Sequence, residues 1–164
     1  RLTDPALAGG ALLDVGIYPL SFIAMVLGTD VAEITSSCVK TDTGVDAVNT
    51  ILLKYRNGVL AAAHSGMLGA TEQAGIVYGT KGYLMAKNIN NVDRVDIYDN
   101  ERHLVETIEI PEQITGFEDE VRASMQAIRA GKIECEQMPH AEILRMMEVM
   151  DTLRAQWGIR YPFE

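Results

Sequence analysis

Apolar residues recur every three or four positions between residues 11 and 27, which predicts a helix. Gly28 follows as the expected C-cap. Pro19 is expected to remove the hydrogen bond to the Val15 carbonyl and to kink the helix. An acid, Asp14, and a phenol, Tyr18, stand four residues apart in this apolar stretch, so a helix places them on one face, one turn apart.

From residue 31 the period of the pattern changes to two, which is typical of strands. Asn57-Gly58 is a strong signal for a two-residue hairpin, and short polar turns are also expected at residues 79–82 and 99–102. Such short connections favour antiparallel pairing. Strands are expected over residues 31–40, 46–56, 59–67, 72–78, 83–87, 94–98 and 103–110.

The last third of the chain returns to helical spacing. Residues 118–130 form an amphipathic pattern with Val121, Met125 and Ile128 on one face, and a longer helix is expected over residues 139–157. A helix, a run of antiparallel strands and further helices predict an α+β fold, with an open sheet and helices on one face. We expect one domain over residues 1–164. The apolar strands leave a second sheet face that another subunit or domain is expected to cover.

Composition narrows the possible partners. The 164 residues carry 14 basic and 23 acidic side chains, a net charge of −9, which disfavours nucleic acid and anionic membranes as partners. The longest apolar stretch, about residues 17–27, is too short to span a bilayer. The two cysteines are far apart in the sequence, which argues against a disulfide framework or a zinc site and favours a cytoplasmic protein.

No complete catalytic constellation is present in the sequence. The glycine-rich nucleotide fingerprints and the common hydrolase and zinc motifs are missing, and the GxxG at residues 79–82 is interpreted as a turn. His64, His103 and His140 have no companion at ligand spacing, so ordinary core or surface roles are expected for them and no metal site is predicted.

Asp14 and Tyr18 therefore remain the candidate chemistry. They are either a functional pair or a structural one, in which the two groups satisfy each other or a backbone cap. A phenol acts as an acid only when a neighbour lowers its pKa or orients its proton. Asp14 alone would raise the pKa of Tyr18, so a cation is expected nearby, and the motif contains none.

The run AGGALLDVGIYP at residues 8–19 resembles the opening signature of the Gfo/Idh/MocA oxidoreductase family. The tail agrees with its dihydrodiol dehydrogenase-like branch, through GFE at 116–118, MPHAE at 138–142 and GIRYPF at 158–163. The resemblance implies a chain that is only the C-terminal domain of a longer enzyme. In that family a Rossmann domain precedes it, binds NAD or NADP and carries a catalytic lysine.

The resemblance also implies roles for single residues. Tyr18 would be the proton donor and acceptor at the substrate hydroxyl or carbonyl, and Asp14 would orient or tune it. Gly9 and Gly10 would let the loop approach cofactor and substrate, and the lysine of the missing domain would be the expected cation. Sugars, polyols and dihydrodiols are the implied substrates.

Arg1 is not a start methionine, so the chain is expected to be part of a longer protein. The whole enzyme is expected to assemble as a homodimer or higher oligomer through the sheet face. This chain alone is expected to be inactive, because hydride transfer needs the cofactor domain. The alternative is a non-catalytic dimerisation or binding domain that kept the fold and lost the chemistry.

Overall fold

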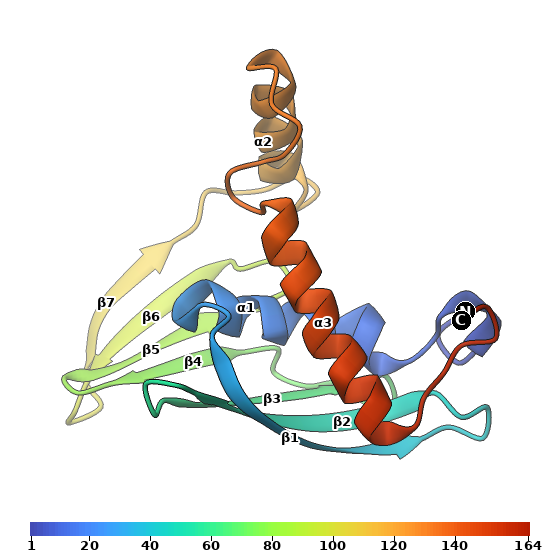
Figure 1. Cartoon of the computed structure of the whole chain (residues 1–164). Helices are drawn as coiled ribbons and strands as arrows, with labels where there is room; N and C mark the ends of the chain where they lie inside the picture. Colours follow the sequence, from blue (N-terminus) through green and yellow to red (C-terminus); the bar gives the residue numbers. More distant parts are fainter. The chain divides into compact units, whose positions relative to one another are not determined.

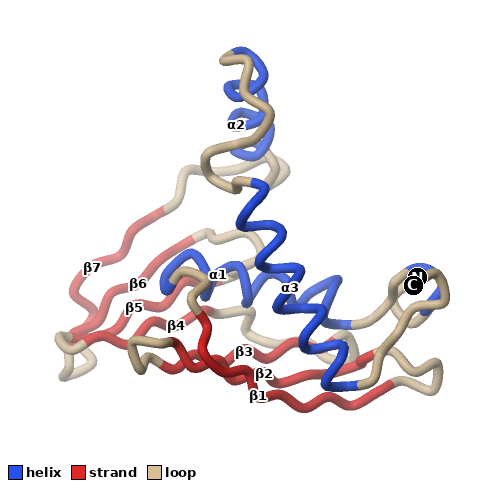
Figure 2. The backbone as a smooth tube through the Cα atoms, in the orientation of Figure 1, coloured by secondary structure: helices blue, strands red, loops and turns tan.

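The computed structural model describes residues 1–164. Contacts group them into two compact units: residues 1–70 with 141–164, and residues 71–140. The single domain expected over residues 1–164 stays a prediction. Both units contain an antiparallel sheet and at least one helix, so the α+β prediction is confirmed (Figures 1 and 2).

The first unit contains a three-stranded sheet with two helices on one face. The strands β1 (Val31–Lys40), β2 (Asp46–Tyr55) and β3 (Leu60–Gly66) pair in that order, with β2 in the centre. The helices α1 (Ile17–Leu27) and α3 (His140–Trp157) lie over the same face of this sheet (Figure 1). The chain enters α1 through a short 3-10 turn, η1 (Pro5–Leu7), and a π-helix, η2 (Leu12–Gly16).

Burial in β2 follows the predicted period of two. Ile51, Leu53 and Tyr55 are buried, whereas Thr50, Leu52 and Lys54 on the opposite face are exposed. The buried face meets apolar residues of both helices, because a strand sends alternate side chains to one side. The core cluster consists of Leu12, Leu20, Ile23, Ile51, Leu53, Tyr55, Ala63, Met146, Met150 and Leu153.

The N-terminal helical stretch is longer than the apolar run expected from the sequence. By length and composition alone, Pro5–Leu27 could cross a membrane. Three of its apolar residues, Leu12, Leu20 and Ile23, instead belong to the core cluster shared with β2 and α3. A core helix passes the same test of length and composition, so the absence of a membrane partner stays a prediction.

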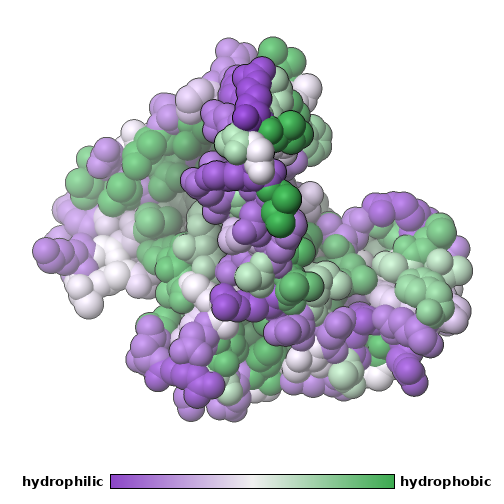
Figure 3. Space-filling view, turned by 45° about the horizontal axis from the view of Figure 1, so that its top comes forward, coloured by the Kyte–Doolittle hydropathy of each residue, from purple (hydrophilic) through white to green (hydrophobic).

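The second unit contains a four-stranded antiparallel meander and one helix. All seven strands expected from the sequence are present, but their hydrogen bonds form two sheets, and β3 does not pair with β4. The helix α2 has no buried residue, and its predicted apolar face of Val121, Met125 and Ile128 is exposed; Figure 3 shows hydrophobic residues at the surface over this helix. The elements are β4 (Gly75–Gly79), β5 (Gly82–Lys87), β6 (Arg94–Asp99), β7 (Leu104–Glu109) and α2 (Glu118–Arg129).

Candidate functional site

The helix that carries the candidate acid and phenol forms, but its first turns are not α-helical. Asp14 lies in the π-helix η2, and Tyr18 lies in the first turn of α1. Pro19 has no N–H to offer the Val15 carbonyl, and it is the third residue of α1, which begins directly after this π segment. A π-turn contains an extra residue, so the angle between Asp14 and Tyr18 differs from that of a regular α-helix. Such segments are frequent at functional sites.

Asp14 and Tyr18 are not hydrogen-bonded to each other. Asp14 Oδ1 instead accepts from Arg1 Nη2 at 2.5 Å, and the two side chains are 28% and 70% exposed. Tyr18 is 41% exposed, so solvent reaches its side chain. Mutual satisfaction of the acid and the phenol, one form of the structural alternative, is therefore not what the structure shows. A cation does lie beside Asp14, but it comes from this chain.

The two glycines before the helix are surrounded by atoms of this chain. A Cβ on Gly9 would lie 2.6 Å from the Leu2 carbonyl oxygen and 2.8 Å from the Asp4 nitrogen. Gly10 has a φ of +126°, and a Cβ there would overlap Asp46 Oδ1. Glycine is thus required by local packing at both positions. Their role toward a cofactor or substrate stays a prediction.

The structure also brings together a buried polar network that the sequence did not reveal. Asp46 Oδ2 accepts from the Leu12 backbone N–H and from Asn49 Nδ2, both at 2.8 Å. Asn49 Oδ1 in turn accepts from Ser65 Oγ at 2.9 Å. Asp46 and Asn49 are each 1% exposed. The only sequence signal is an acid at the start of an apolar strand, whose partner Leu12 lies 34 positions away.

The C-terminal residues close over the same region. The Tyr161 hydroxyl donates to the Gly9 carbonyl oxygen at 2.9 Å, and its ring stacks on Phe163 with the centroids 5.6 Å apart. Burial raises the pKa of Tyr161, and the charge of Asp46 acts in the same direction. A neutral phenol is the form that can donate this bond, so burial favours the observed contact.

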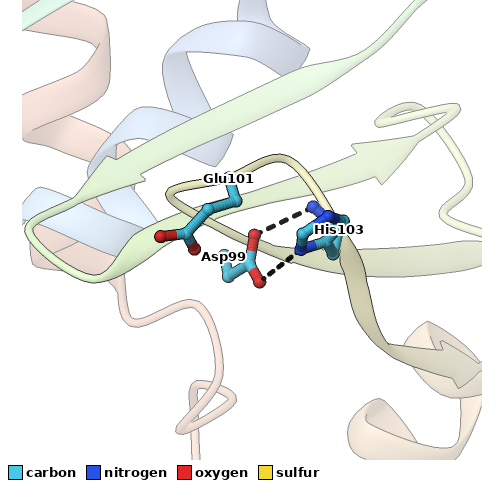
Figure 4. Close-up of side chains that lie close together, drawn as sticks. All are labelled: Asp99, Glu101 and His103. Carbon is cyan, nitrogen blue, oxygen red and sulfur yellow. Dashed lines mark hydrogen bonds and ion pairs between the residues drawn. The ribbon is translucent and has the colours of Figure 1, made fainter.

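A second cluster lies at the turn between β6 and β7, in the other unit. Ligand atoms of Asp99, Glu101 and His103 come within 4.8 Å of one another (Figure 4). His103 therefore does have companions at ligand distance, contrary to the sequence-based expectation, because a tight turn folds positions i, i+2 and i+4 together. Both oxygens of Asp99 accept from His103, its backbone N–H at 2.8 Å and Nδ1 at 3.2 Å, and this backbone bond lowers the pKa of Asp99. The contacts drawn in Figure 4 thus close the turn.

Comparison with known proteins decides the family. The model of the GFO/IDH/MocA C-terminal domain matches residues 1–85, about half of the chain. The chain belongs to the Gfo/Idh/MocA family. The matched part of this Gfo/Idh/MocA domain contains η2, α1 and β1–β3, and so all the predicted site residues.

Relatives in this family are oxidoreductases. A trans-1,2-dihydrobenzene-1,2-diol dehydrogenase from Danio rerio is 28% identical over 98% of this chain and 50% of its own length. The scyllo-inositol 2-dehydrogenase (NADP(+)) IolU from Bacillus subtilis is 27% identical over 97% of this chain and 48% of its own. The chain thus spans about half the length of these relatives.

Solved structures agree with the fold. A 3-ketoreductase from Actinomadura kijaniata, crystallised with NADP and TDP-benzene, superposes with a TM-score of 0.75 at 28% identity, over 90% of this chain and 46% of that one. A UDP-N-acetylglucosamine 3-dehydrogenase from Acidithiobacillus ferrooxidans, at 16% identity and a TM-score of 0.73, covers 88% of this chain and 46% of its own, and supports the fold alone. Both solved proteins therefore share the α+β fold of this chain.

Proposed function

We propose that this chain is the C-terminal, substrate-binding and oligomerisation domain of an NAD(P)-dependent oxidoreductase. The whole enzyme would act on a CH–OH or C=O group of a sugar, polyol or dihydrodiol. The observation that carries this proposal is Tyr18, a solvent-accessible phenol two residues after a π-helical segment, in a Gfo/Idh/MocA domain. The relatives named above are dehydrogenases of a diol and an inositol, which supports the substrate class.

Tyr18 would exchange a proton with the reacting oxygen of the substrate. Its side chain is accessible and its hydroxyl has no hydrogen-bond partner in this chain, so a substrate hydroxyl or carbonyl could take that place. Asp14 lies one turn earlier and would orient or tune the phenol. General acid–base catalysis of this kind contributes about 10²- to 10⁴-fold.

The nicotinamide cofactor is assigned mainly to the part of the enzyme that precedes this domain. When bound, it would accept a hydride from a CH–OH group or donate one to a C=O group. In this chain the Cβ positions of Gly9 and Gly10 are filled by its own atoms, so these glycines do not leave an open cradle for a dinucleotide. We therefore place no step of the reaction on them, and the chain alone is proposed to be inactive.

The test is an assay of the full-length protein, which follows NAD(P)H absorbance over a panel of sugars, polyols and diols. Tyr18→Phe should lower kcat at least about 100-fold, because it removes only the hydroxyl. Tyr78→Phe is the matched control, since Tyr78 is an exposed tyrosine on β4 of the other unit. Equal kcat in the Tyr18→Phe variant and the wild type would refute the role of Tyr18.

A second candidate is a non-catalytic dimerisation domain, and one observation favours an assembly role. The face of the β1–β3 sheet opposite the helices exposes Val39, Leu52 and Leu60, which are 64%, 43% and 60% accessible. Apolar side chains on a sheet face favour a protein partner. We propose a homodimer or higher oligomer through this face. Leu52→Glu should shift the protein to monomer on a sizing column, whereas a wild type that is already monomeric would contradict it.

The two candidates separate in the same full-length protein. An oligomer that turns over no member of the panel with either cofactor would favour the non-catalytic domain. Turnover that depends on Tyr18 would favour the enzyme. We further propose a cytoplasmic location, in keeping with the free thiols of Cys38 and Cys135, and fractionation of cells would test it.

A further inference from the structure

We propose that Asp46 is a positioning residue, whose buried carboxylate anchors the start of the helix that carries Asp14 and Tyr18. The proposal rests on the proposed function for its catalytic consequence, but not for the anchor itself. Asp46 Oδ2 accepts from the Leu12 backbone N–H at 2.8 Å, two residues before Asp14. The first N–H groups of a helix have no partner within the helix, so an acceptor from a neighbouring strand fixes where the helix begins.

The charge of Asp46 is balanced by this helix terminus rather than by a cation. No lysine, arginine or histidine lies within 4.0 Å of its carboxylate, although Asp46 is only 1% exposed. A buried carboxylate without a counter-ion is costly, and helix N-terminal N–H groups are one arrangement that stabilises it. Asn49 supplies a second donor at 2.8 Å. The helix start and the carboxylate therefore stabilise each other.

A second anchor follows on the other side of Asp14. Ser65 on β3 donates to Asn49, and its Oγ lies 3.0 Å from where a Cβ of Gly16 would be. The π-helix thus contacts β3 closely at Gly16, while Leu12 is held by Asp46 on β2. Asp14 lies between these two points, and Tyr18 follows the second by two residues. The network therefore holds the segment whose geometry the proton transfer would need.

The glycine before the helix fits the same arrangement. Gly10 has a positive φ, and any side chain there would overlap Asp46 Oδ1. The close approach of the Gly10 backbone to the carboxylate therefore requires glycine. The absence of a Cβ at Gly10 therefore allows the Asp46 carboxylate to lie against this backbone.

The experiment measures amide hydrogen exchange and steady-state kinetics in the full-length protein. Asp46→Ala should speed exchange of the Leu12 amide at least about tenfold, because the acceptor is lost, and should lower kcat more than it raises KM. Asp46→Asn keeps a carbonyl oxygen at the position of Oδ2, so it should restore most of the protection and of kcat. Asp96→Ala is the matched control, since Asp96 is 2% exposed on β6 of the other unit and should leave the Leu12 amide unchanged.

Ser65→Ala keeps the proposal testable if Asp46→Ala does not fold. It removes one bond of the network and should speed exchange across residues 12–18 at least about threefold. The proposal is overturned if Asp46→Ala, or Ser65→Ala in its place, exchanges in this segment like the Asp96→Ala control. If no substrate is turned over, the proposed function fails, while the exchange data still decide whether Asp46 is the anchor.

Discussion

Gly10→Ala gives the most direct test of how the candidate segment is built. The substitution adds one methyl group at a residue with a φ of +126°, where that methyl overlaps Asp46 Oδ1. The backbone conformation alone costs about 1–2 kcal/mol for a residue with a Cβ. Moving the carboxylate away leaves the buried Leu12 N–H unpaired, which costs about 1–3 kcal/mol more. The expected loss in the free energy of unfolding is therefore about 2–5 kcal/mol.

Gly44→Ala separates the two contributions. Gly44 also has a positive φ, +90°, but a Cβ there would meet nothing within 4 Å. It carries only the backbone cost of about 1–2 kcal/mol. Gly10 and Gly44 lie in the same unit, so one unfolding transition reports on both.

Urea unfolding followed by the fluorescence of Trp157 is the appropriate assay. Trp157 is the single tryptophan of the chain; it packs against the core of this unit and donates from Nε1 to Ser36 Oγ at 2.9 Å. The midpoint for Gly10→Ala should fall below that for Gly44→Ala by on the order of 1 M. In an Asp46→Ala background the extra loss should disappear, because the overlapping oxygen is gone. Equal losses for the two glycines in the wild-type background would refute the close approach to Asp46.

Two further predictions concern the core and the pH response. Leu153→Ala should destabilise the first unit by about 2–5 kcal/mol in the same urea assay, because Leu153 is 0% exposed. Leu144→Ala on the same helix is the control: Leu144 is 64% exposed, so its loss should change stability by less than about 0.5 kcal/mol. The Thr115 backbone N–H, with other N–H groups near it, lowers the pKa of Glu118 from 4.5 to about 2. The stabilisation by Glu118 is therefore complete above about pH 4.5 and is lost as the pH falls toward 2. Amide exchange of Thr115 should accelerate over that range in the wild type. The Glu118→Gln variant should show no such pH dependence.

Much of the fold follows from local patterns in the sequence. The period-two strands and the Asn57-Gly58 turn predict the β2–β3 hairpin because both signals are local. The helix over residues 11–27 was also predicted, but its π segment was not, since hydrophobic spacing does not distinguish a π-turn from an α-turn. The division into two sheets was missed as well, because a strand pattern does not say whether β3 and β4 share hydrogen bonds.

The site was predictable only where its signal was local. Asp14 and Tyr18 stand out as polar residues in an apolar helix. Asp46 shows no such local signal, because its hydrogen-bond partner Leu12 lies 34 positions away. The amphipathic pattern of residues 118–130 correctly predicted a helix, but no pattern says what covers its apolar face. Whether a side chain is buried depends on residues far away in the sequence, and a single sequence does not show which residues these are.

The orientation of Asp14 depends on the backbone more than on its own ion pair. Arg1 is 70% exposed, and an ion pair with so accessible a partner contributes roughly 0–1 kcal/mol and weakens with salt. Such a contact holds a side chain weakly. The hydrogen bond from the Leu12 N–H to Asp46 is buried, so solvent does not reach it as it reaches Arg1. The direction in which Asp14 and Tyr18 project is therefore set by the anchored helix start, and a change at Asp46 should disturb both residues even though it touches neither.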